Sequence, residues 1–201
     1  MDPNDRPDRR HWPSAAPSAP CPEAAVGGSG RTRVEEGEAQ QARIATLHTR
    51  LLSGSSATAT LEHWCTENGL SAQARVRALR VHQLRPAPEA VRNALQAPAD
   101  AWIEYRRVQL ICSDRLLSEA DNWYLPSRLT PAMIAQLQES DAPFGRVVDA
   151  LQFQRETLSD HRFWPPKGDA GVVLEVHALL RDQLQRPFSY VVESYLAQIL
   201  P

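Results

Sequence analysis

The stretch 106–126 constrains the fold more than any other part of the chain, because it has the two-residue period of a β-strand and then reverses direction. Its first half has an apolar face and a mixed face that holds an arginine: Val108, Leu110 and Cys112 against Tyr105, Arg107, Gln109 and Ile111. Residues 113–115 are typical of a turn, and a second strand over 116–125 ends at Pro126, which has no backbone N–H for a sheet. An antiparallel hairpin is therefore predicted, with Arg107 either in water or directed at an anion.

The remaining elements are predicted as further strands in hairpins, with helices between them. Apolar residues at helical spacing, together with capping residues, predict helices over 35–52, 60–68, 88–95 and 131–140. Alternating or continuous apolar runs predict strands over 75–84, 153–158, 172–180 and 188–196, and a proline-containing stretch predicts a loop over 161–169. This order favours an α+β fold with an antiparallel sheet of about six strands and flanking helices.

Composition limits the class of protein. The chain has 201 residues and a formal net charge of −2, so no charge excess points to nucleic acid or to an anionic membrane surface. No apolar run approaches the roughly 18 residues of a membrane span, and no secretory signal is visible. Three widely spaced cysteines fit a reducing compartment and offer no metal-ligand spacing. The expected location is the cytoplasm.

The chain divides into three predicted segments. Residues 1–33 are rich in proline and glycine and have little to bury, so we expect a disordered tail. Residues 34–57 are predicted to form an N-terminal helical extension, and residues 58–201 the folded domain.

The central hairpin and its downstream landmarks resemble the chorismate pyruvate-lyase family, bacterial enzymes that make 4-hydroxybenzoate. In this family an arginine is followed after four residues by a cysteine, and a proline ends the next fourteen residues. The resemblance covers roughly residues 58–200. The matching positions are Arg107, Cys112, Pro126, the turn Pro143-Phe144-Gly145-Arg146, Arg155, and Glu193 inside the last apolar strand.

The resemblance implies an internal ligand cavity and a lyase that eliminates pyruvate from chorismate. Arginine forks match carboxylates, so Arg107, Arg146 and Arg155 would hold the substrate, beside Phe144 and Gly145. By resemblance, Arg107 grips the ring carboxylate and Glu193 acts as general acid at the ether oxygen. The implied partner is a small aromatic or cyclic carboxylic acid, and neither a metal nor an organic cofactor is implied.

Two departures from the family pattern leave other interpretations open. Asp121 occupies the position of a family glycine beside the ligand carboxylate, where it would repel an anion or neutralise Arg107 or Arg146. The family's arginine-rich run is replaced by residues 176–179. The alternatives are a non-catalytic aromatic-acid-binding domain of the same fold, similar to the effector domains of some transcription regulators, and an enzyme acting on another small acid. No basic helix-turn-helix is apparent in the N-terminal region.

The candidate residues also have ordinary structural interpretations. Apart from the resemblance, Arg107 on a mixed strand face is more typical of a surface arginine, and Glu193 on a terminal strand is more typical of an exposed glutamate. Arg146 would pair with Asp141 or Asp149. Cys112 is expected to be a small core residue, because no basic partner is evident nearby.

Overall fold

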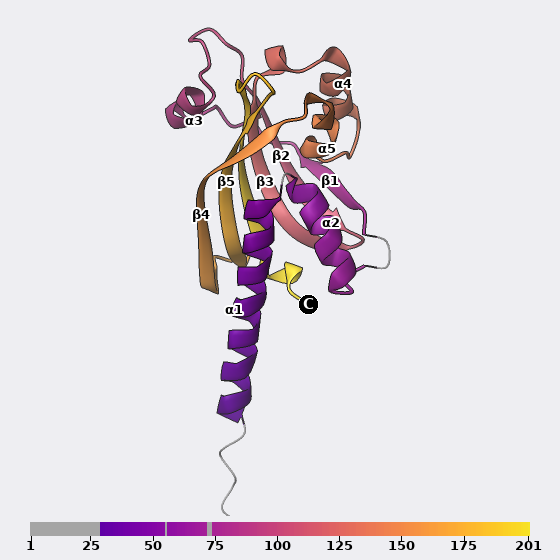
Figure 1. Ribbon diagram of the computed structural model, residues 1–201, viewed down its shortest axis with the longest axis vertical. Coiled ribbons are helices and arrows are strands. Elements are labelled where there is room, and N and C mark those ends of the chain that lie inside the picture. Colours follow the sequence, from indigo (N-terminus) through magenta and orange to yellow (C-terminus); the bar gives the residue numbers. More distant parts are fainter. Residues whose placement is uncertain (1–28, 55, 72–73) are drawn as a thin grey trace, which may run out of the picture.

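The computed structural model describes residues 29–54, 56–71 and 74–201, which form a six-stranded antiparallel sheet with helices on both faces (Figure 1). The predicted disordered segment lies largely outside these residues. The strands are β1 (Val76–Val81), β2 (Glu104–Cys112), β3 (Arg115–Tyr124), β4 (Gln154–Lys167), β5 (Val172–Arg181) and β6 (Pro187–Leu196). The α-helices are α1 (Ser29–Ser53), α2 (Ala57–Glu67), α3 (Glu89–Ala94), α4 (Pro131–Glu139) and α5 (Phe144–Val147). Three 3₁₀ turns, η1 (Pro126–Arg128), η2 (Asp149–Leu151) and η3 (Ala197–Ile199), complete these elements. The predicted α+β class with about six strands is confirmed.

The strand order is β1-β2-β3-β6-β5-β4, and every neighbouring pair is antiparallel. The predicted β2–β3 and β5–β6 hairpins are confirmed, and they lie side by side through the β3–β6 pair. In this register Arg107 is paired with Asp121, and Ala120 with Glu193. Strands β3 and β6, which are distant in sequence, therefore lie next to each other at the centre of the sheet.

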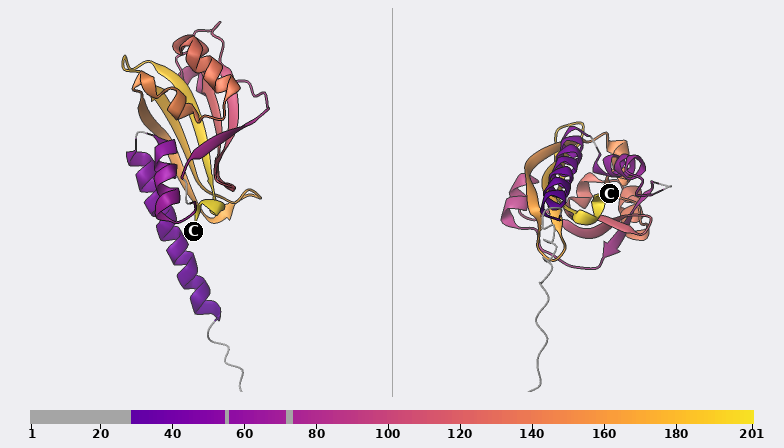
Figure 2. Two further views of the ribbon diagram at one scale, coloured as in Figure 1. Left: turned by 90° about the vertical axis from the view of Figure 1, so that its right-hand side faces the viewer. Right: turned by 90° about the horizontal axis from the view of Figure 1, so that it is seen from below.

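Helices α1 and α2 pack against one face of the sheet, which we call the inner face (Figures 1 and 2). The apolar stripe of α1 is buried there, with Ile44, Leu47 and Leu51 at most 2% exposed. Trp64 of α2 is also buried, and its indole N–H donates to the carbonyl of Ile199 at 2.9 Å. Helices α1 and α2 thus form a second layer, and they share a hydrophobic core with the sheet and with η3.

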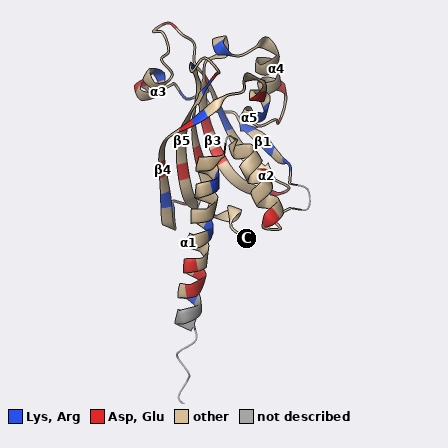
Figure 3. Cartoon of the chain, in the orientation of Figure 1, with Lys and Arg blue, Asp and Glu red and all other residues tan. Residues whose placement is uncertain are grey.

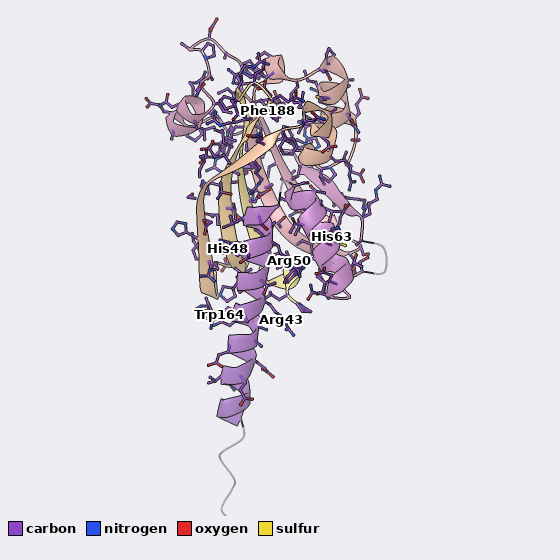
Figure 4. All side chains as sticks on the ribbon, viewed as in Figure 1. Arg43, His48, Arg50, His63, Trp164 and Phe188 are labelled. Carbon is purple, nitrogen blue, oxygen red and sulfur yellow. The ribbon has the colours of Figure 1, made fainter. Side chains whose placement is uncertain are left out.

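The α4–α5 segment covers the same face farther along the strands, and α3 covers the opposite, outer face. Helix α4 begins at Pro131, as predicted, and Thr130 is its N-cap, accepting the N–H of Met133 at 3.2 Å. Phe188 of β6 is buried under the α4–α5 segment, at the end of the sheet remote from the projecting part of α1 (Figure 4). The two helical covers of the inner face therefore meet over the middle of the sheet.

Strand β4 is longer than predicted. The expected loop over 161–169 is wrong for most of its length, because β4 continues to Lys167 and pairs with β5 as far as Val172. Two register shifts, at Thr157/Ser159 and Arg162/Lys167, absorb the irregular part. Since β4 is an edge strand, its prolines need no partner on the open side. Proline content therefore misled the prediction at a position where proline is tolerated.

Helix α1 starts at Ser29, earlier than the predicted residue 35, and its N-terminal half projects beyond the sheet (Figure 1). Figure 3 shows acidic residues on this projecting part. None of the described helices has a stretch apolar and long enough to cross a bilayer. The C-terminal half of α1, by contrast, belongs to the core.

We expect α1 to contribute directly to the stability of the domain. Leu47→Ala removes a side chain with 0% exposure and should lower the free energy of unfolding by about 2–5 kcal/mol, measured by urea denaturation. Leu52→Ala is the matched control, because Leu52 lies on the same helix and is 39% exposed. Equal effects of the two substitutions would mean that α1 does not share the core.

Candidate functional site

A small, partly open cavity of about 60 Å³ lies between the inner face of the sheet and the helices. Its floor comes from β2, β3 and β6, and its roof from the N-termini of α2 and α5. The walls are mostly apolar, with six polar side chains: Ser56, Thr58, Arg106, Asn122, Arg155 and Glu193. Ligand sites usually measure about 300–1,000 Å³, so the walls must separate before a ring-sized ligand can enter.

Arg155 and Glu193 form a buried ion pair on this face. The Nη2 of Arg155 donates to Oε2 of Glu193 at 2.5 Å, and the two side chains are 4% and 9% exposed. The hydroxyl of Tyr195 donates to the same oxygen at 2.9 Å. Burial opposes the charge of Arg155, but the attraction of Glu193 and Tyr195, together with the hydrogen bond to Glu193, outweighs burial and raises the pKa of Arg155. Burial raises the pKa of Tyr195 well above its usual value, so the phenol stays a donor.

Arg106 is a buried cation without an acidic partner. It is 3% exposed and lines the cavity from β2. Its Nη2 donates to the carbonyl of Ala142 at 3.2 Å, whereas its Nε is buried with no acceptor. Burial lowers its pKa to about 10, which leaves it charged at neutral pH. Among the residues that the structure describes, no carboxylate forms an ion pair with this guanidinium.

Asn122 supplies a neutral donor. It lines the cavity from β3 and is 4% exposed. Its carboxamide oxygen accepts the hydroxyl of Ser189 at 2.7 Å. The amide NH₂ is therefore the group that remains for a ligand.

The predicted meeting of Arg107 and Glu193 in one cavity is wrong. Arg107 and Asp121 lie on the outer face, whereas Glu193 lies on the inner face. Arg107 donates to Asp121 at 3.1 Å and to Glu119 at 2.6 Å, and Tyr105 also donates to Asp121. Burial works against the charge of Arg107, but the two carboxylates raise its pKa. Asp121 thus neutralises Arg107 and does not occupy the ligand space.

The other predicted residues divide between the cavity and the surface. Phe144, Gly145, Arg155 and Glu193 line the cavity. Arg146 does not, because its Nη2 pairs with Glu62 of α2 at 2.5 Å. Neither expected partner of Arg146, Asp141 or Asp149, is the one observed.

Sequence reasoning missed Arg106 and Asn122. The signal for Arg106 was present, because the alternation that puts Val108 and Leu110 on the apolar face also puts Arg106 there. The four-residue spacing before Cys112 pointed to the next residue, Arg107, instead. A shift of one residue moves a side chain to the other face of a sheet. For Asn122, only the alternation of residues along β3 indicated which face of the sheet it occupies.

Comparison with known proteins gives one close relative and several similar folds. No family model matches the chain. The uncharacterized protein y4mC of Sinorhizobium fredii (strain NBRC 101917 / NGR234) is 37% identical over 178 residues, which cover 78% of this chain and 75% of that protein.

Among solved structures, PhnF from Mycobacterium smegmatis has a TM-score of 0.50 and 10% identity, over 75% of this chain and 67% of PhnF. This likeness shows a common fold. A second structure is the ligand-binding domain of a protein assigned to the GntR family of transcriptional regulators, from Bordetella bronchiseptica. Its TM-score is 0.46 and its sequence identity 17%, over 61% of this chain and 83% of that one. The candidate regulator YydK from Bacillus subtilis has a TM-score of 0.45 and 14% sequence identity, over 63% of this chain and 59% of YydK. The chain therefore spans less than two thirds of YydK.

The buried pair makes a prediction about stability. Arg155→Met leaves the Glu193 carboxylate buried without its cation and should cost about 3–5 kcal/mol in urea denaturation. The double variant Arg155→Met/Glu193→Leu should recover most of that loss, because both charges are gone. Arg181→Met breaks the more exposed pair with Glu156 and should cost at most about 1 kcal/mol. A small effect of Arg155→Met, equal to that of Arg181→Met, would contradict the buried pair.

Proposed function

Since the chain belongs to the same family as the uncharacterized protein y4mC and shares the fold of PhnF, we propose that it is a small-molecule-binding domain that holds a small organic acid without converting it. The proposal rests chiefly on the small, mostly apolar cavity and on the polar groups that converge in it. Such a cavity is what a binding domain requires, and its polar groups fix the orientation of the bound molecule.

The arrangement of Glu193 argues for binding over lyase chemistry. A general acid has to present a proton to the leaving oxygen of the substrate. Glu193 accepts hydrogen bonds from both Arg155 and Tyr195 at the same oxygen, so it acts here as an acceptor. Arg107, the expected anchor for the ring carboxylate, lies on the other face of the sheet. The two groups that the lyase mechanism needs are therefore not assembled around one substrate.

The proposed role has a counterpart in the Bordetella bronchiseptica protein, which is described as a ligand-binding domain. For this chain, ligand binding is proposed from its own cavity and from the arrangement of the polar groups that line it.

Binding should depend on the free volume of the cavity. In the wild-type protein, benzoate or 4-hydroxybenzoate should raise the melting temperature in a concentration-dependent way, followed by differential scanning fluorimetry. Ala120→Leu adds three carbons to a residue that lines the cavity and should abolish this shift. Ala132→Leu is the control, because Ala132 is exposed on α4. Equal shifts in both variants would place the bound acid outside the cavity.

The protein should not turn over chorismate. Incubation of the purified protein with chorismate should release neither pyruvate, measured by a coupled lactate dehydrogenase assay, nor 4-hydroxybenzoate, measured by chromatography. The physical reason is that Arg107 and Glu193 face opposite sides of the sheet. Release of both products in equal amounts, lost in Glu193→Gln, would contradict the binding proposal and favour the lyase.

A further inference from the structure

The N-terminus of α2 opens into the cavity. Ser56, Ala57 and Thr58 all line it. The N-cap Ser56 accepts the N–H of Ala59 at 3.4 Å through its side chain and the N–H of Thr60 at 3.1 Å through its carbonyl. The N–H groups of Ala57 and Thr58 have no carbonyl acceptor within the helix. They are donors at the positive end of the 11-residue helix, where an anion is stabilised.

Arg106 lines the same cavity from the sheet, and its buried, unpaired charge is a second and independent indication of an anion site. Only 3% of this residue is exposed, and its Nε has no acceptor. An unpaired buried charge is costly unless a partner neutralises it. A ligand anion at this place would provide that partner.

The turn before α5 lies beside both groups of donors. Arg106 donates to Ala142 at one side of this turn. On the other side, a Cβ on Gly145 would lie 3.8 Å from Oγ of Ser56 and 4.0 Å from Oγ1 of Thr58. The start of α2 and the guanidinium of Arg106 are thus held near one short segment, residues 142–145.

We infer that Arg106 and the N-terminus of α2 form a subsite for one carboxylate group of the bound molecule. This inference rests on the proposed function and names the class of its ligand. Arg155 and Glu193 cancel each other's charge, so Arg106 leaves the cavity with one net positive charge among its described lining residues. One negative group neutralises that charge, whereas a second would stay buried without a cation.

The rest of the cavity selects an apolar body. Val108, Leu110 and Val191 line it from the sheet, and Phe144 and Phe153 lie at the side. Aromatic rings at this position favour contact with a ring or a compact aliphatic group. The ligand class is therefore a monocarboxylic acid with a small apolar body, and dicarboxylates such as chorismate should bind more weakly.

The test compares matched probes by isothermal titration calorimetry. Benzoate should bind, whereas benzamide, of the same shape and without charge, and the dianion phthalate should each bind at least about 10-fold more weakly. Arg106→Met should weaken benzoate binding by about 10- to 100-fold, because hydrogen bonds to a charged donor are lost. It should also raise the melting temperature of the free protein, since an unpaired buried charge disappears. Arg107→Met is the control, as this neighbouring arginine lies on the outer face and should leave the affinity for benzoate unchanged.

Thr58→Asp tests the helix contribution without weakening the helix. An aspartate in the first turn of α2 is favourable for the helix, so the variant should fold. Its carboxylate would occupy the subsite and should abolish benzoate binding. If benzamide binds as well as benzoate, or if Arg106→Met and Thr58→Asp bind benzoate like the wild type, the carboxylate subsite is refuted while the binding proposal stands. If no probe binds at all, both are refuted.

Discussion

Neighbouring residues of a β-strand point to opposite faces of the sheet, and this alternation decides which charges the protein buries. Arg106 and Arg107 are adjacent, yet one is 3% exposed against the cavity and the other is engaged by two carboxylates on the outer face. The same alternation separates Asp121 from Asn122 on β3. The outer face thus collects neutralised pairs near water, while the inner face holds the cation that lacks a carboxylate. Because of that division, a bound anion would meet Arg106 and not Arg107.

Much of the fold could be predicted because its signals are local. The alternation of residues 105–112 predicts both faces of β2, and Thr130 with Pro131 marks the start of α4. Gly69 directly follows the predicted helix over 60–68 and has a φ of +62°, a conformation that suits glycine after a helix. The proline-containing end of β4 could not be predicted in this way, since tolerance of proline there depends on its being an edge strand.

The candidate site depended on information that is not local. Arg155 lies on β4 and Glu193 on β6, with β5 between them, so their contact appears only once the strand order is known. Cys65 and Cys112, distant in sequence, likewise come together, and burial followed by their mutual hydrogen bond raises the pKa of Cys65 to about 12. The expectation of Cys112 as a core residue is confirmed, because it is 0% exposed. Spacing in the sequence selected Arg107, whereas the packing of α2 and the 142–145 turn selects Arg106.

The position of the cavity links the start of α2 to the long helix that precedes it. Gly54 follows α1 directly, and a Cβ there would lie 3.0 Å from the carbonyl of Arg50 and 2.9 Å from the hydroxyl of Thr60. This close approach leaves little room for a side chain at position 54. Farther from the cavity on α1, His48 forms a hydrogen bond with Asp160 of β4 at 2.7 Å. His48 lies on the side of α1 that faces β4, and Trp164 of β4 lies near the same side (Figure 4). Helix α1 thus contacts the start of α2 at Gly54 and strand β4 at His48, and it links the helical roof of the cavity to the edge of the sheet.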